Sequence, residues 1–550
     1  MRKLTLLLLA AAALLAGQTL PSGPQALVFL SDVDDSDQPY GLYLPKNYDA
    51  SKKYPLVVSL HGAYSNHRVN LRRIFGQGNL PGETDPQATR YFPALPDRDF
   101  IVACPFARGT MGYQGIAERD VFAVLADVKK RFSIDEDRIY LTGLSMGGGG
   151  TLWIALTHPD IFAAIAPVCP SIPPGTEALA ANALNLPVHL FHGEVDPVVP
   201  VDVSRRLHKQ FLDLGVLSSY VEFPGVKHNS WVPAYKDAEI FNWFGQFRRN
   251  RFPDRVHYST WWYKYNSAYW VRVDGLTPGE LATIDASYSS PNRLKVTTSG
   301  LDGFTLQLTG HPKYTPGQPV TVNVNGSDIK TTAQESISFL KDGSKWKIGR
   351  YEPPGGDKRA GFEGPIREAV ASRHIYVYGT ADEPKEAEVT LRNGLALFAS
   401  DWKGPNARLA LWLRAIADKN VTKADLENSN LVLMGTKETN SVLARYAASM
   451  PITLKADAKD YGLVFVAPAD GRLVLVNSGL PWWTGVDRLK RPGLRYLWSP
   501  FQALMSFPDF ILFKGSLDNV IAEGNFTRSW KVPEEAATKM LATGAVEILK

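Results

Sequence analysis

The stretch Arg138-Ile139-Tyr140-Leu141-Thr142-Gly143-Leu144-Ser145-Met146-Gly147-Gly148 decides the fold of the N-terminal part of this 550-residue chain. An apolar run ends in Gly143–Gly147, which fits the pattern G-x-S-x-G, and a second apolar run, Thr151–Leu156, follows it. A strand, a sharp turn and a helix in this order expose the serine hydroxyl and direct the next backbone N–H toward a reacting carbonyl oxygen. Glycine on both sides suits a turn without room for a β-carbon. We therefore predict that Ser145 is a nucleophile; the alternative is a glycine-rich turn with an incidental serine.

Apolar segments on both sides of this stretch predict further strands. They are Gln25–Leu30, Tyr40–Leu44, Tyr54–Gly62, Phe100–Pro105, Ile161–Cys169, Pro187–Gly193 and Ser219–Phe223. Between them, Ala117–Phe132 places its apolar residues on one face, which is typical of an amphipathic helix. Strands that alternate with helices predict a mostly parallel sheet with both faces covered. The polar stretch 65–96 is long for a plain connection, which favours a lid or a substrate-facing excursion.

Two candidate partners of Ser145 follow predicted strands farther along the chain. Asp196 comes after the strand 187–193, and His228 comes after the strand 219–223. The order Ser, Asp, His is that of the α/β-hydrolase arrangement, in which strand-end loops converge on one edge of the sheet. His228 would act as general base and Asp196 would orient its imidazole. Glu194 and Asp202 are rival acids, but we prefer Asp196 because an Asp-Pro pair in a strand-end loop fixes the chain direction.

Backbone N–H groups near the serine are the candidate oxyanion donors. Met146 directly follows the nucleophile. The loop after the strand 54–62 supplies the second donor in this class, and Gly62 and Ala63 are the natural positions for it. The alternative for Gly62 is a glycine that only the turn requires. His61 and His192 also lie at strand ends, and we interpret them as structural or pocket-lining. This chemistry requires no metal ion and no organic cofactor, so neither is predicted.

Four segments carry a family resemblance: Tyr113–Val121, Asp135–Gly148, Pro159–Ala164 and Phe191–Pro200. They resemble the prolyl oligopeptidase-like branch of α/β-hydrolases that includes esterase D, polyhydroxybutyrate depolymerases and feruloyl esterases. The resemblance covers roughly residues 38–248 and implies an α/β-hydrolase domain with a Ser-His-Asp triad. It separates esterases poorly from peptidases. Prolyl oligopeptidases usually carry an N-terminal β-propeller, for which this chain leaves no room, and this favours an esterase.

The remainder of the chain predicts two smaller domains. Short alternating strands with Gly, Pro and Asn turns after residue 253 predict an immunoglobulin-like β-sandwich. Pro353–Gly356 is a linker signal, and the strands and helices after it predict a small doubly wound α/β domain. An aromatic cluster in Trp261–Trp270 is expected in the sandwich core or at an interface rather than as a platform for sugar rings. The expected domains are 18–252 (α/β-hydrolase), 253–352 (β-sandwich) and 353–550 (α/β).

The N-terminus predicts export. Arg2 and Lys3 precede an apolar block, Leu4–Leu15, and small residues follow it, which is typical of a signal peptide over residues 1–17. The protein is therefore expected to be secreted or periplasmic. The block is too short to span a membrane, and no membrane span is predicted elsewhere. A net charge of +5 without a basic cluster argues against nucleic acid as a partner.

The two cysteines, Cys104 and Cys169, are predicted to be buried thiols. Each would end a core strand. In the α/β-hydrolase sheet that the resemblance implies, these two strands would be about three strand spacings apart, roughly 14 Å at about 4.8 Å per spacing. A disulfide needs α-carbons within about 7 Å.

The predicted function is a secreted serine hydrolase that cleaves carboxylic esters through an acyl-enzyme on Ser145. One alternative is a prolyl oligopeptidase-like serine peptidase that uses the same triad. A second is a non-catalytic binding protein whose hydrolase domain is only a scaffold. The expected partner is a small ester or peptide substrate, either free or attached to a polysaccharide or another polymer.

Overall fold

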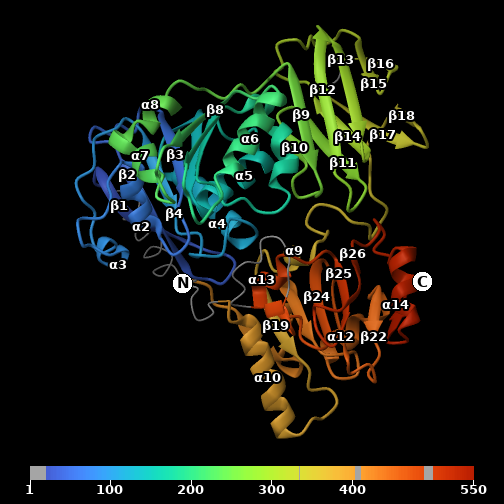
Figure 1. The fold of residues 1–550 in the computed structure, drawn as a ribbon. Coiled ribbons are helices and arrows are strands. Elements are labelled where there is room, and N and C mark those ends of the chain that lie inside the picture. Colours follow the sequence, from blue (N-terminus) through green and yellow to red (C-terminus); the bar gives the residue numbers. More distant parts are fainter. Residues whose placement is uncertain (1–19, 333–334, 403–409, 489–499, 550) are drawn as a thin grey trace, which may run out of the picture.

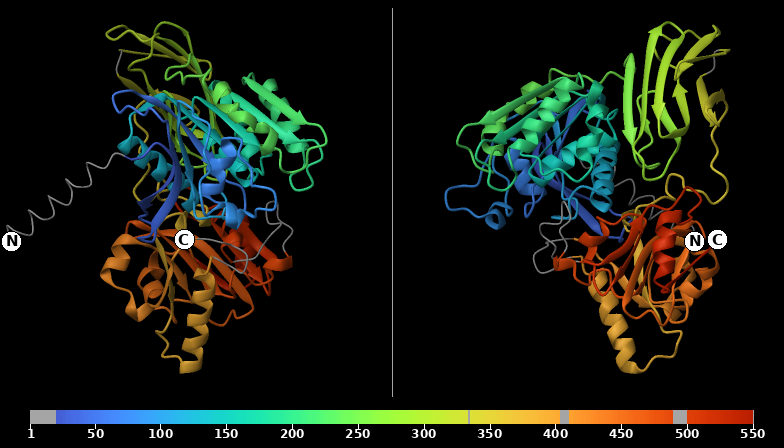
Figure 2. Two further views of the ribbon diagram at one scale, coloured as in Figure 1. Left: turned by 90° about the vertical axis from the view of Figure 1, so that its left-hand side faces the viewer. Right: turned by 45° about the vertical axis from the view of Figure 1, so that its right-hand side comes forward.

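The computed structural model describes residues 20–332, 335–402, 410–488 and 500–549, which form three parts along the chain (Figure 1). We call them the hydrolase domain (20–252), the β-sandwich (253–352) and the C-terminal domain (353–549), after the predicted boundaries. The β-sandwich lies beside the hydrolase domain, and the C-terminal domain lies below it (Figures 1 and 2). The signal peptide predicted for residues 1–17 lies outside the described residues.

An eight-stranded sheet forms the centre of the hydrolase domain, in the order β1-β2-β4-β3-β5-β6-β7-β8. β2 pairs antiparallel with β1 and β4, whereas all neighbours from β4 through β8 pair parallel. This topology confirms the predicted α/β-hydrolase fold and its mostly parallel sheet. The strands are β1 (Gly23–Leu30), β2 (Asp37–Leu44), β3 (Tyr54–Leu60), β4 (Ile101–Pro105), β5 (Ile134–Leu144), β6 (Ala164–Val168), β7 (Val188–Gly193) and β8 (Ser218–Phe223).

Helices cover both faces of this sheet because successive strand residues point to opposite sides. In β3, Leu56 and Val58 join one apolar cluster and Val57 joins the other. The first cluster contains residues of α4 (Ile116–Arg131), α5 (Met146–Thr157) and α6 (Asp202–Asp213). The second contains residues of α2 (His67–Ile74), α7 (Trp231–Ala234) and α8 (Ile240–Phe244).

The stretch 65–96, predicted as a lid or excursion, contributes a layer of the fold. Its helix α2 begins after Asn66, whose side chain accepts the backbone N–H groups of Arg68 and Val69. Leu71 and Ile74 of this helix are fully buried against the sheet. The sequence signal for a lid was the polarity of the stretch, but Leu71 and Ile74, three residues apart on one face of α2, are enough to anchor the helix.

Both cysteines are buried and free of a disulfide, as predicted. Cys104 lies in β4, and Cys169 directly follows β6. β3 and β5 separate these two strands in the sheet, which gives the three strand spacings expected from the sequence.

Two five-stranded sheets form the β-sandwich. Their facing residues, among them Ile284, Val296, Phe304 and Phe339, make one apolar core. Alternate residues of β12 are buried, which is the period-2 pattern seen in the sequence. One sheet contains β9 (Arg255–Thr260), β12 (Ala282–Ser290), β13 (Arg293–Ser299), β15 (Val320–Val324) and β16 (Ser327–Thr331), and the other contains β10 (Ser267–Ala268), β11 (Val271–Leu276), β14 (Leu301–Gln307), β17 (Ser336–Asp342) and β18 (Lys345–Ile348).

The C-terminal domain contains a seven-stranded sheet in the order β20-β19-β21-β24-β23-β25-β26. β20, β19, β21 and β24 pair parallel, as in a doubly wound sheet, but the remaining strands pair antiparallel. A two-residue turn, Asp470–Gly471, with φ of 45° and 78°, makes β23 and β24 a hairpin. The strands are β19 (His374–Tyr378), β20 (Arg414–Ala417), β21 (Asn430–Met434), β23 (Tyr461–Ala469), β24 (Arg472–Gly479), β25 (Phe510–Lys514) and β26 (Val520–Gly524).

A buried carboxylate connects the turns at the strand ends of the parallel half. The Asp418 carboxylate accepts hydrogen bonds from the Thr380 N–H (2.9 Å) and hydroxyl (2.5 Å) and from the Ser441 N–H (2.7 Å). Doubly wound sheets bind ligands in this position. Asp418 therefore links the turns after β19 and β21.

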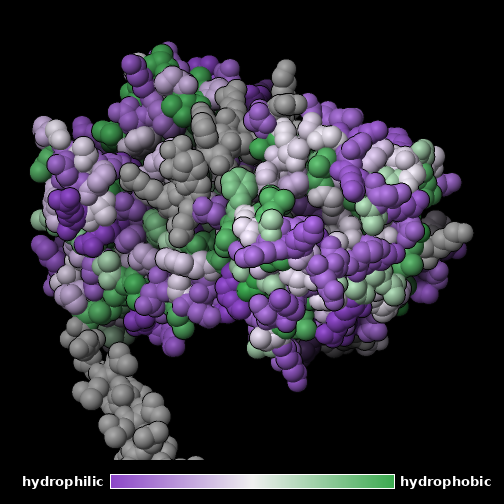
Figure 3. Space-filling model, turned by 90° about the horizontal axis from the view of Figure 1, so that it is seen from below, coloured by the Kyte–Doolittle hydropathy of each residue, from purple (hydrophilic) through white to green (hydrophobic). Residues whose placement is uncertain are grey.

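Among the described residues, the model contains no helix whose length and apolar character would let it cross a bilayer. Hydrophilic residues cover most of the face seen from below, and hydrophobic residues occur there in small groups (Figure 3).

Candidate active site

Ser145 occupies the turn between β5 and α5. Its φ of 56° and ψ of −116° lie in a region that residues with a β-carbon rarely adopt. The backbone is held in this strained conformation by three hydrogen bonds. The Ser145 N–H donates to the Val168 carbonyl (2.9 Å), and its carbonyl accepts the N–H groups of Gly149 and Ser171 (both 3.0 Å).

The glycines around the serine are required by close packing, as the sequence predicts for the two flanking positions. A β-carbon on Gly143 would lie 2.3 Å from the Gly147 carbonyl oxygen, and one on Gly147 would lie 2.2 Å from the Leu60 carbonyl oxygen. One on Gly149 would lie 1.8 Å from a carbonyl oxygen of the loop after β6. The helix can therefore start directly beneath the serine only because these side chains are absent.

The structure brings the three predicted side chains together at the carboxyl ends of the strands. His228, after β8, places Nε2 3.0 Å from the Ser145 hydroxyl and Nδ1 2.7 Å from an Asp196 oxygen. The Asp196 side chain is fully buried, whereas that of His228 is 21% exposed. With Nδ1–H donated to the carboxylate, Nε2 is the ring nitrogen that can accept the serine proton.

The hydrogen bonds around Asp196 favour the ionised form of its carboxyl group. Burial alone would raise its pKa, but hydrogen bonds from His228 and from the N–H groups of Val199 and Val198 hold the pKa below the ordinary range of an aspartate. The two backbone bonds measure 3.0 and 2.8 Å. The carboxylate is therefore ionised at neutral pH and can stabilise an imidazolium.

The rival acids have other partners, whereas the strand-end histidine His192 contacts Asp196 itself. Its Nε2 lies 3.3 Å from the Asp196 oxygen that faces His228. Glu194 accepts the N–H of Gly225 (2.8 Å), and Asp202 forms an exposed ion pair with Arg205 (3.1 Å). His192 lies with Nδ1 2.8 Å from a serine hydroxyl of α6 and Nε2 3.1 Å from a carbonyl oxygen of its own loop. Burial lowers the pKa of His192, so it supports the Asp196 loop as a neutral ring.

The candidate oxyanion donors lie on two sides of Ser145. Met146 is the first residue of α5, so its N–H belongs to the first-turn donors that no helix carbonyl accepts. Gly62 and Ala63 follow β3, and a β-carbon on Gly62 would lie 3.5 Å from the β-carbon of Ser145. We call residues 61–64 the oxyanion loop.

The loop after β4 supports the oxyanion loop. His61 is buried, with Nε2 2.8 Å from the Phe106 carbonyl oxygen. The Tyr113 hydroxyl donates to the His61 carbonyl (3.0 Å), and the Thr110 hydroxyl accepts the Tyr64 N–H (2.7 Å). The position of the oxyanion loop therefore depends on residues 106–113.

Sequence reasoning missed Trp231. Its ring meets the His228 ring edge-on at 5.5 Å, and the Arg73 guanidinium lies 5.5 Å from the centre of the Trp231 ring. The only sequence signal was a tryptophan three residues after the histidine, which does not show where the ring lies.

One group among the described residues has the composition of a metal site. Potential ligand atoms of Cys169, Asp196 and His228 lie within 4.8 Å of one another. Burial raises the pKa of Cys169 to about 12, and its thiol lies 3.5 Å from the His228 carbonyl oxygen as a donor. A metal would need the thiolate and would compete with the bond between carboxylate and imidazole. We therefore interpret the group as part of the serine site.

A cavity of 830 Å³ lies where the three domains meet. Its lining includes Met111 of the hydrolase domain, Trp261 and Trp262 of the β-sandwich and Met505 of the C-terminal domain, but none of the three triad residues. Both tryptophans are half-buried, whereas Tyr263, Tyr265 and Trp270 of the same aromatic cluster are buried. The cluster is thus mainly core and interface, and three of its residues, Trp261, Trp262 and Tyr263, line the cavity.

Comparison with known proteins places the similarity in the hydrolase domain. Residues 120–241 match the model of the phospholipase/carboxylesterase family. A probable feruloyl esterase C of Aspergillus oryzae is 29% identical over 203 residues, which are 36% of this chain and 69% of that protein. Cutinase 2 of Thermobifida cellulosilytica is 31% identical over 156 residues, 27% of this chain and 58% of the cutinase.

A peptidase is also among the similar proteins. Dipeptidyl-peptidase 5 of Porphyromonas gingivalis is 29% identical over 140 residues, which are 22% of this chain and 17% of that protein. These matches agree with the resemblance drawn from the sequence motifs, including its ambiguity between esters and peptides.

Proposed function

We propose that this chain, an enzyme of the α/β-hydrolase superfamily, hydrolyses carboxylic esters through a covalent intermediate on Ser145. The hydrogen-bonded series from Asp196 through His228 to the Ser145 hydroxyl carries the proposal. The names of two similar proteins, a feruloyl esterase and a cutinase, support an ester as substrate. The peptidase match supports the alternative that the same series cleaves peptides.

In the proposed reaction, His228 removes the proton of the Ser145 hydroxyl as its oxygen attacks the ester carbonyl. The N–H groups of Met146 and of Gly62 or Ala63 stabilise the resulting oxyanion. Collapse of the intermediate releases the alcohol, which takes the proton from His228 and leaves an acyl-serine. Water then attacks the acyl group with the same histidine as base, and the acid leaves.

We also propose that the protein is exported and acts on esters that carry a large alcohol or polymer. The predicted signal peptide supports the first part. The cavity at the domain junction supports the second, because its wall at Met111 and Pro174 comes from the loops after β4 and β6. The same two loops hold the oxyanion loop and the carbonyl of Ser145.

A substrate panel tests the ester proposal. We expect the purified mature chain to turn over p-nitrophenyl acetate, p-nitrophenyl butyrate and methyl ferulate. The kcat/KM for prolyl and alanyl p-nitroanilides should be at least about 1000-fold lower than for methyl ferulate, a difference of about 4 kcal/mol in the barrier. Anilide cleavage at a rate comparable to that of methyl ferulate would instead establish the peptidase.

A fluorophosphonate probe separates both enzyme proposals from the non-catalytic scaffold. It should label the chain at Ser145, located by mass spectrometry of the digested protein, because only an activated serine reacts readily with it. An unlabelled chain that is folded by circular dichroism would favour the scaffold.

Removing an aromatic ring from the cavity tests whether it receives the distal part of the substrate. Trp261→Ala should lower kcat/KM for a feruloylated oligosaccharide about tenfold more than for p-nitrophenyl acetate, because one stacking contact contributes up to about 1.5 kcal/mol. Trp261→Phe keeps a ring and should recover most of the difference. An equal loss on both substrates would contradict a role in distal binding.

A further inference from the structure

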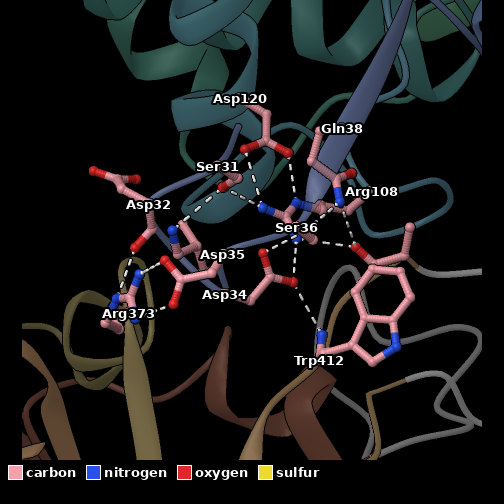
Figure 4. A network of polar contacts seen from close by, with 12 residues as sticks. Ser31, Asp32, Asp34, Asp35, Ser36, Gln38, Arg108, Asp120, Arg373 and Trp412 are labelled. Atoms are coloured by element: carbon pink, nitrogen blue, oxygen red, sulfur yellow. Dashed lines mark hydrogen bonds and ion pairs between the residues drawn. The ribbon is translucent and has the colours of Figure 1, made fainter. Parts of the chain in front are cut away.

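Arg108 lies in the loop after β4 and is fully buried between the hydrolase domain and the C-terminal domain (Figure 4). Its Nε donates to Asp120 (2.6 Å), and its Nη2 donates to Ser31 (2.5 Å) and more weakly to Asp120 (3.5 Å). Nη1 donates to Asp34 (2.7 Å), whose side chain is also fully buried. The partners come from α4 and from the turn between β1 and β2.

The C-terminal domain supplies the remaining acceptor of this guanidinium. The Ala410 carbonyl accepts a second hydrogen bond from Nη1 (3.0 Å), and the Ala410 N–H donates to the Arg108 carbonyl (3.2 Å). The Trp412 N–H donates to Asp34 (3.0 Å). A guanidinium has five N–H donors, and a buried charge is stable only when its donors are satisfied. Without the segment 410–412, one donor of Arg108 would lose its acceptor.

A second contact fixes the same turn to the C-terminal domain from the solvent side. Arg373, which precedes β19, donates to both carboxylate oxygens of Asp35 and to the Asp32 carbonyl (2.8 Å; Figure 4). Asp35 is 70% exposed, so this pair contributes less than the buried contacts at Arg108.

The backbone at Arg108 depends on these contacts. Ala107, Arg108 and Gly109 have φ of 43°, 64° and 94°, and the first two carry β-carbons in a region that disfavours them. Such a conformation persists only where its surroundings hold it. On either side of these residues, Phe106 and Thr110 hold the oxyanion loop at His61 and Tyr64.

We propose that Arg108 is a positioning residue for the oxyanion loop and that docking of the C-terminal domain on Arg108 keeps the Ser145 site active. This inference rests on the proposed serine hydrolase function. The C-terminal domain thus acts as a built-in activator: its segment 410–412 completes the buried network, the network fixes residues 106–110, and these fix the oxyanion donors.

Three variants of the full chain test this coupling. Arg108→Lys keeps the charge but offers three donors in place of five. Ala410→Pro removes the N–H that reaches the Arg108 carbonyl and leaves the guanidinium itself unchanged. Arg119→Gln is the matched control, because Arg119 pairs with the neighbouring Asp32 (3.0 Å) at the surface.

The measurements are kcat and KM on p-nitrophenyl butyrate, with active sites titrated. Arg108→Lys and Ala410→Pro should each lower kcat about 10- to 100-fold, because displaced donors weaken oxyanion stabilisation. KM should change by less than about twofold, since the loss arises in the transition state. The double variant should lose little more than either single variant, because both act through one network. Arg119→Gln should behave as the wild type.

Two further readouts distinguish positioning from a general loss of structure. Hydrogen exchange should accelerate in the peptides that cover residues 61–64 and 106–113 and remain unchanged in β5 to β7. The rate of Ser145 labelling by a fluorophosphonate should fall in parallel with kcat, and this rate does not depend on the natural substrate. A failure of the ester proposal therefore leaves the test intact.

The inference would be overturned if Ala410→Pro kept wild-type kcat and labelling rate. Multiplicative losses in the double variant, or an equal rise in exchange throughout the hydrolase domain, would also overturn it. If Arg108→Lys does not fold, Ala410→Pro decides the result alone, because it leaves the buried guanidinium and its carboxylate partners in place.

Discussion

Ser145→Ala is expected to lower kcat for ester hydrolysis by about 10⁴- to 10⁶-fold, which is the range that loss of a triad nucleophile produces. The variant keeps the oxyanion donors and the binding surface, so a small residual rate above water remains. Initial rates on p-nitrophenyl butyrate and methyl ferulate, measured at high enzyme concentration, determine the ratio. The fluorophosphonate probe should label the variant no more than a denatured control.

Ser171→Ala is the matched control for this substitution. Ser171 is exposed and supports the Ser145 carbonyl through its backbone N–H (3.0 Å), which the substitution leaves in place. Its activity should lie within about twofold of wild type, because surface substitutions of this kind change little. Activity that survives in Ser145→Ala but is lost in Ser171→Ala would mean that the nucleophile has been assigned wrongly.

The predictable part of the site is the part that local sequence patterns determine. A strand, a G-x-S-x-G turn and a helix place Ser145, and strand-end positions place Asp196 and His228 at the same edge of a parallel sheet. The mostly parallel sheet follows from the alternation of strands and helices. The two free cysteines follow from the strand order of the α/β-hydrolase fold that the motifs resemble, and the structure confirms both predictions.

What was not predictable depends on contacts between distant segments. Arg108 and Ala410 are 302 residues apart. No local sequence pattern predicts that the Ala410 carbonyl accepts a hydrogen bond from the Arg108 guanidinium. Trp231 beside His228 likewise requires the path of the loop after β8. The antiparallel half of the C-terminal sheet depends on the short turn at Asp470–Gly471, which strand composition alone does not distinguish from a crossover.

The identity of the triad acid was only partly predictable from the sequence. Sequence order allowed Asp196, Glu194 and Asp202, and an Asp-Pro argument favoured the first. The structure adds what periodicity cannot show. One oxygen of Asp196 contacts His228 at 2.7 Å and His192 at 3.3 Å, and the other accepts two backbone N–H groups. These contacts fix the orientation of the Asp196 carboxylate, and the carboxylate in turn fixes the orientation of the His228 imidazole.

Asp196→Asn should therefore have the second-largest effect, a fall in kcat of about 10²- to 10⁴-fold with KM nearly unchanged. An asparagine can donate its amide N–H to Nδ1 of His228, which would leave the proton on Nε2, facing Ser145. The ring would then be unable to accept the serine proton. Glu194→Gln and Asp202→Asn, the two rival acids, serve as controls and should stay within about threefold of wild type because their partners are a backbone N–H and a surface arginine.

The same substitution makes a prediction about stability and pH. Hydrogen bonds from His228, Val199 and Val198 outweigh burial and hold the pKa of Asp196 below its usual value of 3.8, so the folded state favours the ionised carboxyl. That contribution is fully present above the unfolded pKa and is lost as the pH falls through the folded pKa. The Tm of Asp196→Asn should lie below that of the wild type at pH 7, and the gap should close as the pH falls below 3.8. A gap that is constant from pH 7 to pH 3, together with a kcat loss no larger than in Glu194→Gln, would assign the orienting role to another acid.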